Sequence, residues 1–161
     1  MLGQWIWRHD TETGATKVVA DGFAKPNGLA FSPDESTLYV SDTGCITGDG
    51  IDSTAPRSIY AYDVVGSGLR NRRLLYVTPS GIPNGIKTDK KGRIYAGCGD
   101  GVHVLSPEGE LLGRILTSLN IGTGMVDHTG GVTNLCFGSG SHAGTLFMLA
   151  EDAIFSVQLN L

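Results

Sequence analysis

Short apolar runs alternate with clusters of Gly, Asp, Ser and Pro along the whole chain. The runs are rich in Val, Ile, Tyr, Phe and Leu, which is typical of β-strands joined by tight turns. No stretch keeps the apolar period of about 3.6 residues that a surface helix requires. The pattern therefore predicts a nearly all-β protein, with strands at 5–8, 16–19, 28–31, 37–41, 58–63, 73–77, 85–88, 93–97, 101–105, 111–116, 133–137, 145–149 and 153–159.

The tripeptide Pro-Asn-Gly opens two groups of these strands, with its asparagine at Asn27 and Asn84. Each copy continues through a strand, a turn with an aspartate, and a tyrosine-bearing strand within "TLYVSDTG" or "RIYAGCGD". A weaker copy begins at "GVTNLCFGSG", where Asn134 lies one position out of register and Thr133 is the alternative equivalent. Units of roughly 40 to 57 residues with four strands each are typical of β-propeller blades, and a β-sandwich with accidental similarity is the alternative.

The strands fall into groups of two, four, four and three, which predicts about three blades, a half-propeller. We expect one partial propeller domain over 1–161, with outer strands at 1–20, blades at 21–78 and 79–117, and a last blade at 130–161 that lacks its outermost strand. Because the first group lacks inner strands, we expect the chain to be the C-terminal half of a longer protein. Open sheet edges favour association, so we also expect two copies to pair as a homodimer that completes a ring.

The repeated asparagines would lie where the first strand of each blade meets the central channel. Amide and carboxylate oxygens are hard ligands that suit Ca²⁺, so asparagines at equivalent blade openings are what a metal on the propeller axis would require. The tripeptide also suits a tight turn, because Asn and Gly tolerate positive φ. The spacing alone leaves both interpretations open.

Both repeats also carry a resemblance to a known family. "GFAKPNGLAFSPDESTLYVSDTG" resembles the signature of the gluconolactonase, senescence-marker (regucalcin) and luciferin-regenerating-enzyme-like family, and "GIPNGIKTDKKGRIYAGCGDGVHVLSPEGELLGRI" resembles its next blade. The segment "GCITGDGIDSTAPRSIYAYDV" is similar to an insert of fungal lactonohydrolases. The resemblance covers nearly the whole chain. It implies a six-bladed propeller that hydrolyses small-molecule lactones around a divalent metal, usually Ca²⁺.

The resemblance also implies roles for the two asparagines. Asn27 matches an asparagine that is a metal ligand in the family. Asn84 stands where the family has an aspartate that is both a metal ligand and the favoured catalytic base or nucleophile. An amide can bind a metal but cannot accept a proton. We therefore expect metal binding at Asn27 and Asn84 with a steep loss of hydrolysis, and a non-catalytic binding or scaffold module is the alternative.

Other candidate residues lie in turns and glycine-rich loops. Asp42 follows "YVS". It either reaches the channel mouth, where it would contact the residues that bind the metal, or caps the turn. Asp127, His128 and His142 are candidates for the mouth of the substrate site. His103 alternates with valines inside a strand and is expected to be structural.

Composition narrows the class of partner. Charged residues make up 17% of the chain and the net charge is −4, which lacks the basic footprint of a nucleic-acid-binding protein. No apolar stretch reaches the roughly 18 residues of a membrane span. Three distant cysteines form neither a disulfide framework nor a zinc motif. Their sparseness slightly favours the cytoplasm, while the likeness to fungal enzymes keeps secretion open. The sequence does not distinguish which lactone would bind.

Overall fold

The computed structural model describes residues 3–117, 131–151 and 153–160. Apart from one turn of 3₁₀ helix, η2 (Gly140–His142), the regular elements in these residues are β-strands, which confirms the all-β prediction. The described part of the chain holds no helix with the length and apolarity that a membrane crossing demands. The strands are β1 (Ile6–His9), β2 (Thr16–Ala20), β3 (Pro26–Phe31), β4 (Thr37–Asp42), β5 (Ile46–Thr47), β6 (Gly50–Ile51), β7 (Ser58–Val65), β8 (Gly68–Val77), β9 (Ile86–Thr88), β10 (Ile94–Cys98), β11 (Gly101–Leu105), β12 (Leu111–Leu116), β13 (Val132–Phe137), β14 (Thr145–Ala150) and β15 (Ile154–Gln158).

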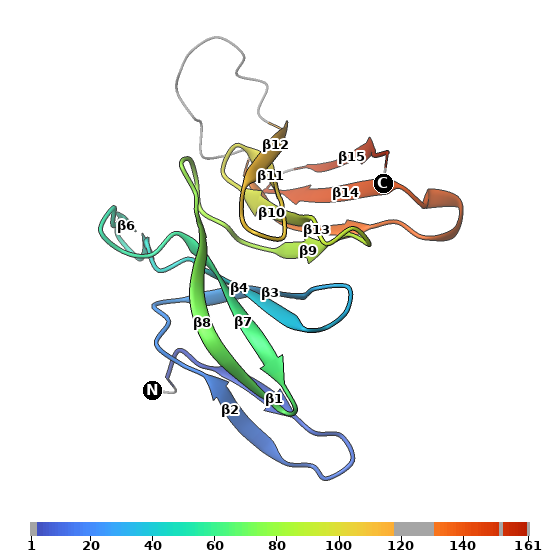
Figure 1. Cartoon of the computed structure of the whole chain (residues 1–161). Coiled ribbons are helices and arrows are strands. Elements are labelled where there is room, and N and C mark those ends of the chain that lie inside the picture. The colour runs from blue at the N-terminus through green and yellow to red at the C-terminus, as the bar shows by residue number, and fades with distance from the viewer. Residues whose placement is uncertain (1–2, 118–130, 152, 161) are drawn as a thin grey trace.

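The strands form antiparallel sheets that follow one another in chain order (Figure 1). These are β1-β2, β3-β4-β7-β8, β9-β10-β11-β12 and β13-β14-β15, so the described strands group as two, four, four and three. A small hairpin, β5-β6, lies inside the segment that joins β4 to β7, and the apolar pattern did not predict it. Apart from this insertion between β4 and β7, each main sheet is built from strands that follow one another in the chain, because short turns make antiparallel pairing local.

The core lies between successive sheets. Strands β4 and β10 are buried on both faces, and their alternate side chains enter different clusters, as the two-residue period of a strand requires. Tyr39 of β4 packs towards β9 and β10, whereas Leu38 and Val40 pack towards β1 and β2. The buried residues of the three clusters are Tyr39, Ile59, Ala61, Ile86, Ile94, Ala96, Cys98 and Leu105; Tyr95, Val102, Val132, Leu135, Leu146 and Met148; and Ile6, Phe23, Leu38, Val40 and Tyr62.

The repeated Pro-Asn-Gly is not a turn with positive φ. Asn27 and Gly28 lie within β3, and Glu35 and Asn71 are the non-glycine residues with positive φ in the described part of the chain. The glycine instead permits neighbouring sheets to approach closely. A Cβ atom at Gly28 would lie 2.4 Å from the carbonyl oxygen of Asn84, which comes just ahead of β9 in the next sheet. The repeat therefore arises from inter-sheet packing, a requirement that the turn interpretation did not include.

The same contact recurs one sheet further along and decides the register of the third copy. The Gly85 N–H donates a 2.9 Å hydrogen bond to the carbonyl oxygen of Thr133. A Cβ atom on Gly85 would also lie 2.6 Å from Oδ1 of Asn134. The Thr133 carbonyl thus faces Gly85 as the Asn84 carbonyl faces Gly28, which favours Thr133 over Asn134 as the equivalent of Asn84.

Candidate functional site

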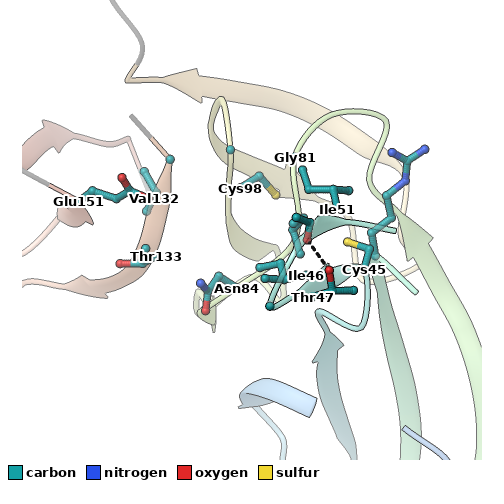
Figure 2. A pocket seen from close by; sticks show the side chains of 16 residues that line it. Cys45, Ile46, Thr47, Ile51, Gly81, Asn84, Cys98, Val132, Thr133 and Glu151 are labelled. Carbon is teal, nitrogen blue, oxygen red and sulfur yellow. Dashed lines mark hydrogen bonds between the residues drawn. The ribbon is translucent and has the colours of Figure 1, made fainter. Parts of the chain in front are cut away.

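A cavity of about 550 Å³ opens where the third and fourth sheets begin, beside the β5-β6 hairpin (Figure 2). Its walls come from the hairpin, the loop 81–84 before β9, the end of β10 and the start of β13. Figure 2 shows Asn84 between two groups of side chains, with Thr133 and Glu151 on one side and Ile46 and Ile51 on the other. Asn84 is the one candidate metal ligand from the sequence that lines this cavity.

Asn84 is held by its backbone between two sheets. Its N–H donates to the carbonyl oxygen of Gly97 at 2.8 Å. Its carbonyl oxygen accepts a 2.7 Å hydrogen bond from the Ser41 hydroxyl, which itself accepts from the N–H of Gly28 at 2.6 Å. The half-buried side chain is therefore presented to the cavity from a fixed backbone position.

Asn27 lies one residue before Gly28, whose close approach to Asn84 brings the two asparagines to the same end of neighbouring sheets. Its side chain is exposed and does not line the cavity. The two asparagines are therefore neighbours because their chain segments pack together, although only Asn84 lines the cavity. Both remain accessible to a ligand at this end of the sheets.

Asp42 acts as a cap for the chain that leads into β3. Its buried carboxylate accepts hydrogen bonds from the backbone N–H groups of Ala24 at 3.0 Å, Lys25 at 2.7 Å and Gly44 at 3.1 Å. These contacts fit the turn-capping interpretation, and Asp42 does not line the cavity. Its contribution to the candidate site is to hold the backbone just ahead of Asn27.

His142, the histidine candidate within the described residues, does not line the cavity. His142 lies in η2 at the far end of β13 from Thr133, where its exposed ring packs edge-on against Phe147 at 5.9 Å. Asp127 and His128 lie outside the described residues. His142 is thus separated from Asn84 by the length of β13.

Sequence reasoning missed most of the other lining residues. Arg57 is the one cation and Glu151 the one carboxylate among the described lining residues, and both side chains are exposed. The sequence indicates Thr133 only as an alternative register for the third copy of the repeat. The signal for the hairpin wall was the unusual length of the segment between the strands at 37–41 and 58–63.

The donors present do not by themselves complete a cation site. Ca²⁺ takes roughly six to eight oxygen ligands, usually including carboxylates. Asn27 and Asn84 offer two neutral amide oxygens. Within residues 3–117, 131–151 and 153–160, no group of three His, Cys, Asp or Glu side chains is arranged to hold a metal ion.

A separate buried network joins the second and third sheets. His103 is fully buried, with Nε2 2.8 Å from Oδ1 of Asp100 and Nδ1 3.0 Å from the Tyr76 hydroxyl. The second oxygen of Asp100 accepts from the Ser80 hydroxyl at 2.7 Å and from Arg114 at 3.1 Å. Burial lowers the pKa of His103, although its contact with Asp100 opposes that effect. This network ties β8 to β11 and fits the structural role expected of His103.

A family model described as the SMP-30/Gluconolactonase/LRE-like region matches residues 3–151, so the chain belongs to this family. A lactonohydrolase, oryH of Aspergillus oryzae, is 33% identical over 97% of this chain and 34% of its own length. The gluconolactonase of Zymomonas mobilis is 33% identical over 90% of this chain and 38% of its own. The resemblance of both repeats to this family is thereby confirmed.

Solved structures support the same assignment. A gluconolactonase of Xanthomonas campestris superimposes with a TM-score of 0.76 and 30% identity, over 96% of this chain and 44% of that one. A regucalcin of Agrobacterium tumefaciens, described as a calcium-binding protein, has a TM-score of 0.65 at 19% identity, which supports the propeller-type fold alone. The chain spans about a third of the lactonohydrolase and less than half of the Xanthomonas structure.

Proposed function

We propose that this chain is part of a lactone hydrolase and carries the portion of its site around Asn84 and the adjoining cavity. In such a reaction water adds to the carbonyl carbon, the ring C–O bond breaks, and the departing oxygen takes a proton to leave a hydroxy acid. The observation that carries the proposal is the family membership of residues 3–151. The position of Asn84 at a cavity of about 550 Å³, which is large enough for a small lactone, supports it further.

We propose further that Asn27 and Asn84 contribute amide oxygens to a divalent cation, most simply Ca²⁺. The remaining ligands would come from the other blades of a complete ring, because this chain spans less than half the length of its relatives. A bound cation would polarise the lactone carbonyl and stabilise its negative oxygen. In a six-bladed ring this chain would supply about three blades.

The amide of Asn84 decides how active such a site can be. It can orient a water molecule by hydrogen bonding, but it cannot take the proton that the water must lose. Glu151 is the one carboxylate among the described lining residues, and its exposed side chain lies on the Thr133 side of the cavity, away from the isoleucines. We therefore expect slow hydrolysis by the chain with Asn84 in place.

The test restores a carboxylate. We expect Asn84→Asp to raise both Ca²⁺ affinity by calorimetry and the rate of glucono-δ-lactone hydrolysis by pH-stat, the rate at least roughly tenfold. Added EDTA should remove the gain. Asn160→Asp, which adds the same charge at an exposed residue away from the cavity, should change neither.

The alternative is a non-catalytic binding or scaffold module, and the amide at position 84 is the observation in its favour. If folded Asn84→Asp gains neither Ca²⁺ binding nor hydrolysis, the scaffold alternative replaces the lactone-hydrolase proposal. Circular dichroism of the variant establishes that it is folded.

A homodimer is the partner proposal for the 161-residue chain. In the described residues β1 pairs only with β2, and β15 only with β14, so each leaves an open edge. The sheet with β1 is the first of the chain and the sheet with β15 is the fourth, so three steps separate them. In a ring of six sheets, three steps are half a turn. Two copies related by a two-fold axis would therefore close the ring. Light scattering should give twice the chain mass, whereas a monodisperse monomer would contradict the pairing.

A further inference from the structure

The β5-β6 hairpin presents an apolar wall to the cavity. Ile46 and Ile51 are directly paired across the hairpin, so their side chains project from the same face. Both line the cavity, although 39% of Ile46 and 59% of Ile51 are exposed to solvent. Ile82 and Val132 add two more branched apolar side chains to the lining. Such a concentration of exposed isoleucine beside a cavity is typical of a surface that contacts an apolar ligand.

The wall is held in place from its base. The Cys45 N–H donates to the carbonyl oxygen of Pro56 at 2.9 Å, and the Asp52 N–H donates to that of Cys45 at 2.8 Å. The Lys25 ammonium group donates to the carbonyl oxygen of Ile46 at 2.5 Å, which joins the hairpin to the chain ahead of β3. These contacts fix the base of the hairpin, so the wall is organised before a ligand arrives.

Thr47 of the hairpin and Arg57 also line the cavity, but the Thr47 hydroxyl donates to the carbonyl oxygen of Gly50 at 3.0 Å within the hairpin. Thr133 and Glu151 lie apart from the wall. Asn84 stands between the isoleucines on one side and Thr133 and Glu151 on the other (Figure 2). A ligand that spans the cavity would therefore meet amide, hydroxyl and carboxylate groups at one end and hydrocarbon at the other. A polyhydroxylated lactone would place several hydroxyl groups against isoleucine, where they lose water without gaining a partner.

We propose that this cavity takes a lactone with an alkyl substituent, in preference to a sugar lactone. The ring would face Asn84 and Thr133, and the alkyl chain would lie on the wall of Ile46 and Ile51. This inference rests on the proposed lactone-hydrolase function and names its substrate class.

The experiment compares lactones of one ring size on the 161-residue protein by titration calorimetry. The probes are δ-valerolactone, δ-octalactone, δ-decalactone and glucono-δ-lactone. We expect affinity to rise with alkyl length from δ-valerolactone to δ-decalactone, and glucono-δ-lactone to bind more weakly than δ-decalactone. Ile51→Ser should weaken δ-decalactone binding about tenfold and leave δ-valerolactone binding almost unchanged, because δ-valerolactone has no chain to reach the wall.

Leu112→Ser is the matched control. Leu112 lies on β12, is 56% exposed and does not line this cavity, so the variant removes a comparable side chain elsewhere. Two results would overturn the alkyl preference and leave the lactone-hydrolase proposal standing. One is that glucono-δ-lactone binds as tightly as δ-decalactone or more tightly. The other is that Ile51→Ser binds δ-decalactone as tightly as the parent protein does. Failure of every lactone to bind a folded protein overturns both.

Discussion

The close approach of neighbouring sheets at Gly28 makes a sharp prediction for Gly28→Ala. The new Cβ atom would lie 2.4 Å from the carbonyl oxygen of Asn84, whereas ordinary contacts begin near 3.4 Å. The segment around Asn84 would have to move by about 1 Å. Overpacking of this kind costs about 1–3 kcal/mol.

The movement would also disturb the Ser41 bridge, in which the hydroxyl accepts from the Gly28 N–H and donates to the Asn84 carbonyl. Its loss adds about 1 kcal/mol, which brings the expected destabilisation to about 2–4 kcal/mol. For a domain of this size that lowers the melting temperature by roughly 5–15 °C.

The measurement is thermal and urea unfolding followed by circular dichroism, with Gly113→Ala as the matched control. Gly113 lies on β12, and a Cβ atom there would meet no atom within 4 Å. We expect Gly113→Ala to be neutral or slightly stabilising, because alanine is better than glycine within a strand. Equal melting temperatures for the two variants would refute the packing explanation of the repeated Pro-Asn-Gly.

Two further predictions concern titratable groups. Burial lowers the pKa of His103, so the unfolded chain binds a proton more readily than the folded one. Stability should be fully present above about pH 6.5 and decrease as the pH falls through that value. The measurement is the free energy of urea unfolding at pH 7.5 and pH 5. His103→Gln should reduce the difference between the two values, and the exposed His142→Gln should not. An equal difference in both variants would contradict the role of His103. Burial also raises the pKa of Cys98 to about 12, and Cys45 is likewise buried, whereas Cys136 is exposed. Ellman's reagent should therefore react rapidly with one thiol, that of Cys136, in a native sample at pH 7.5. Two or more rapid equivalents would show that a buried thiol is accessible.

The sequence by itself determined the strand content, the grouping of strands and the family. These features are encoded locally: the strand runs and turn residues predict the antiparallel pairs, and apart from the β5-β6 insertion each main sheet is built from strands adjacent in the chain. It also singled out Asn84, since the residue stands in a repeated motif where the resembled family has an aspartate.

The tertiary structure alone decided what the motif does and which residues share the cavity. Gly28 is required by a carbonyl that lies far along the chain, on another sheet, so no local pattern could separate close packing from a turn. The cavity joins the β5-β6 hairpin to Asn84 and Thr133, whereas His142 lies at the other end of β13. Such neighbours are set by how sheets stack face to face, and stacking depends on side chains that are distant in the sequence.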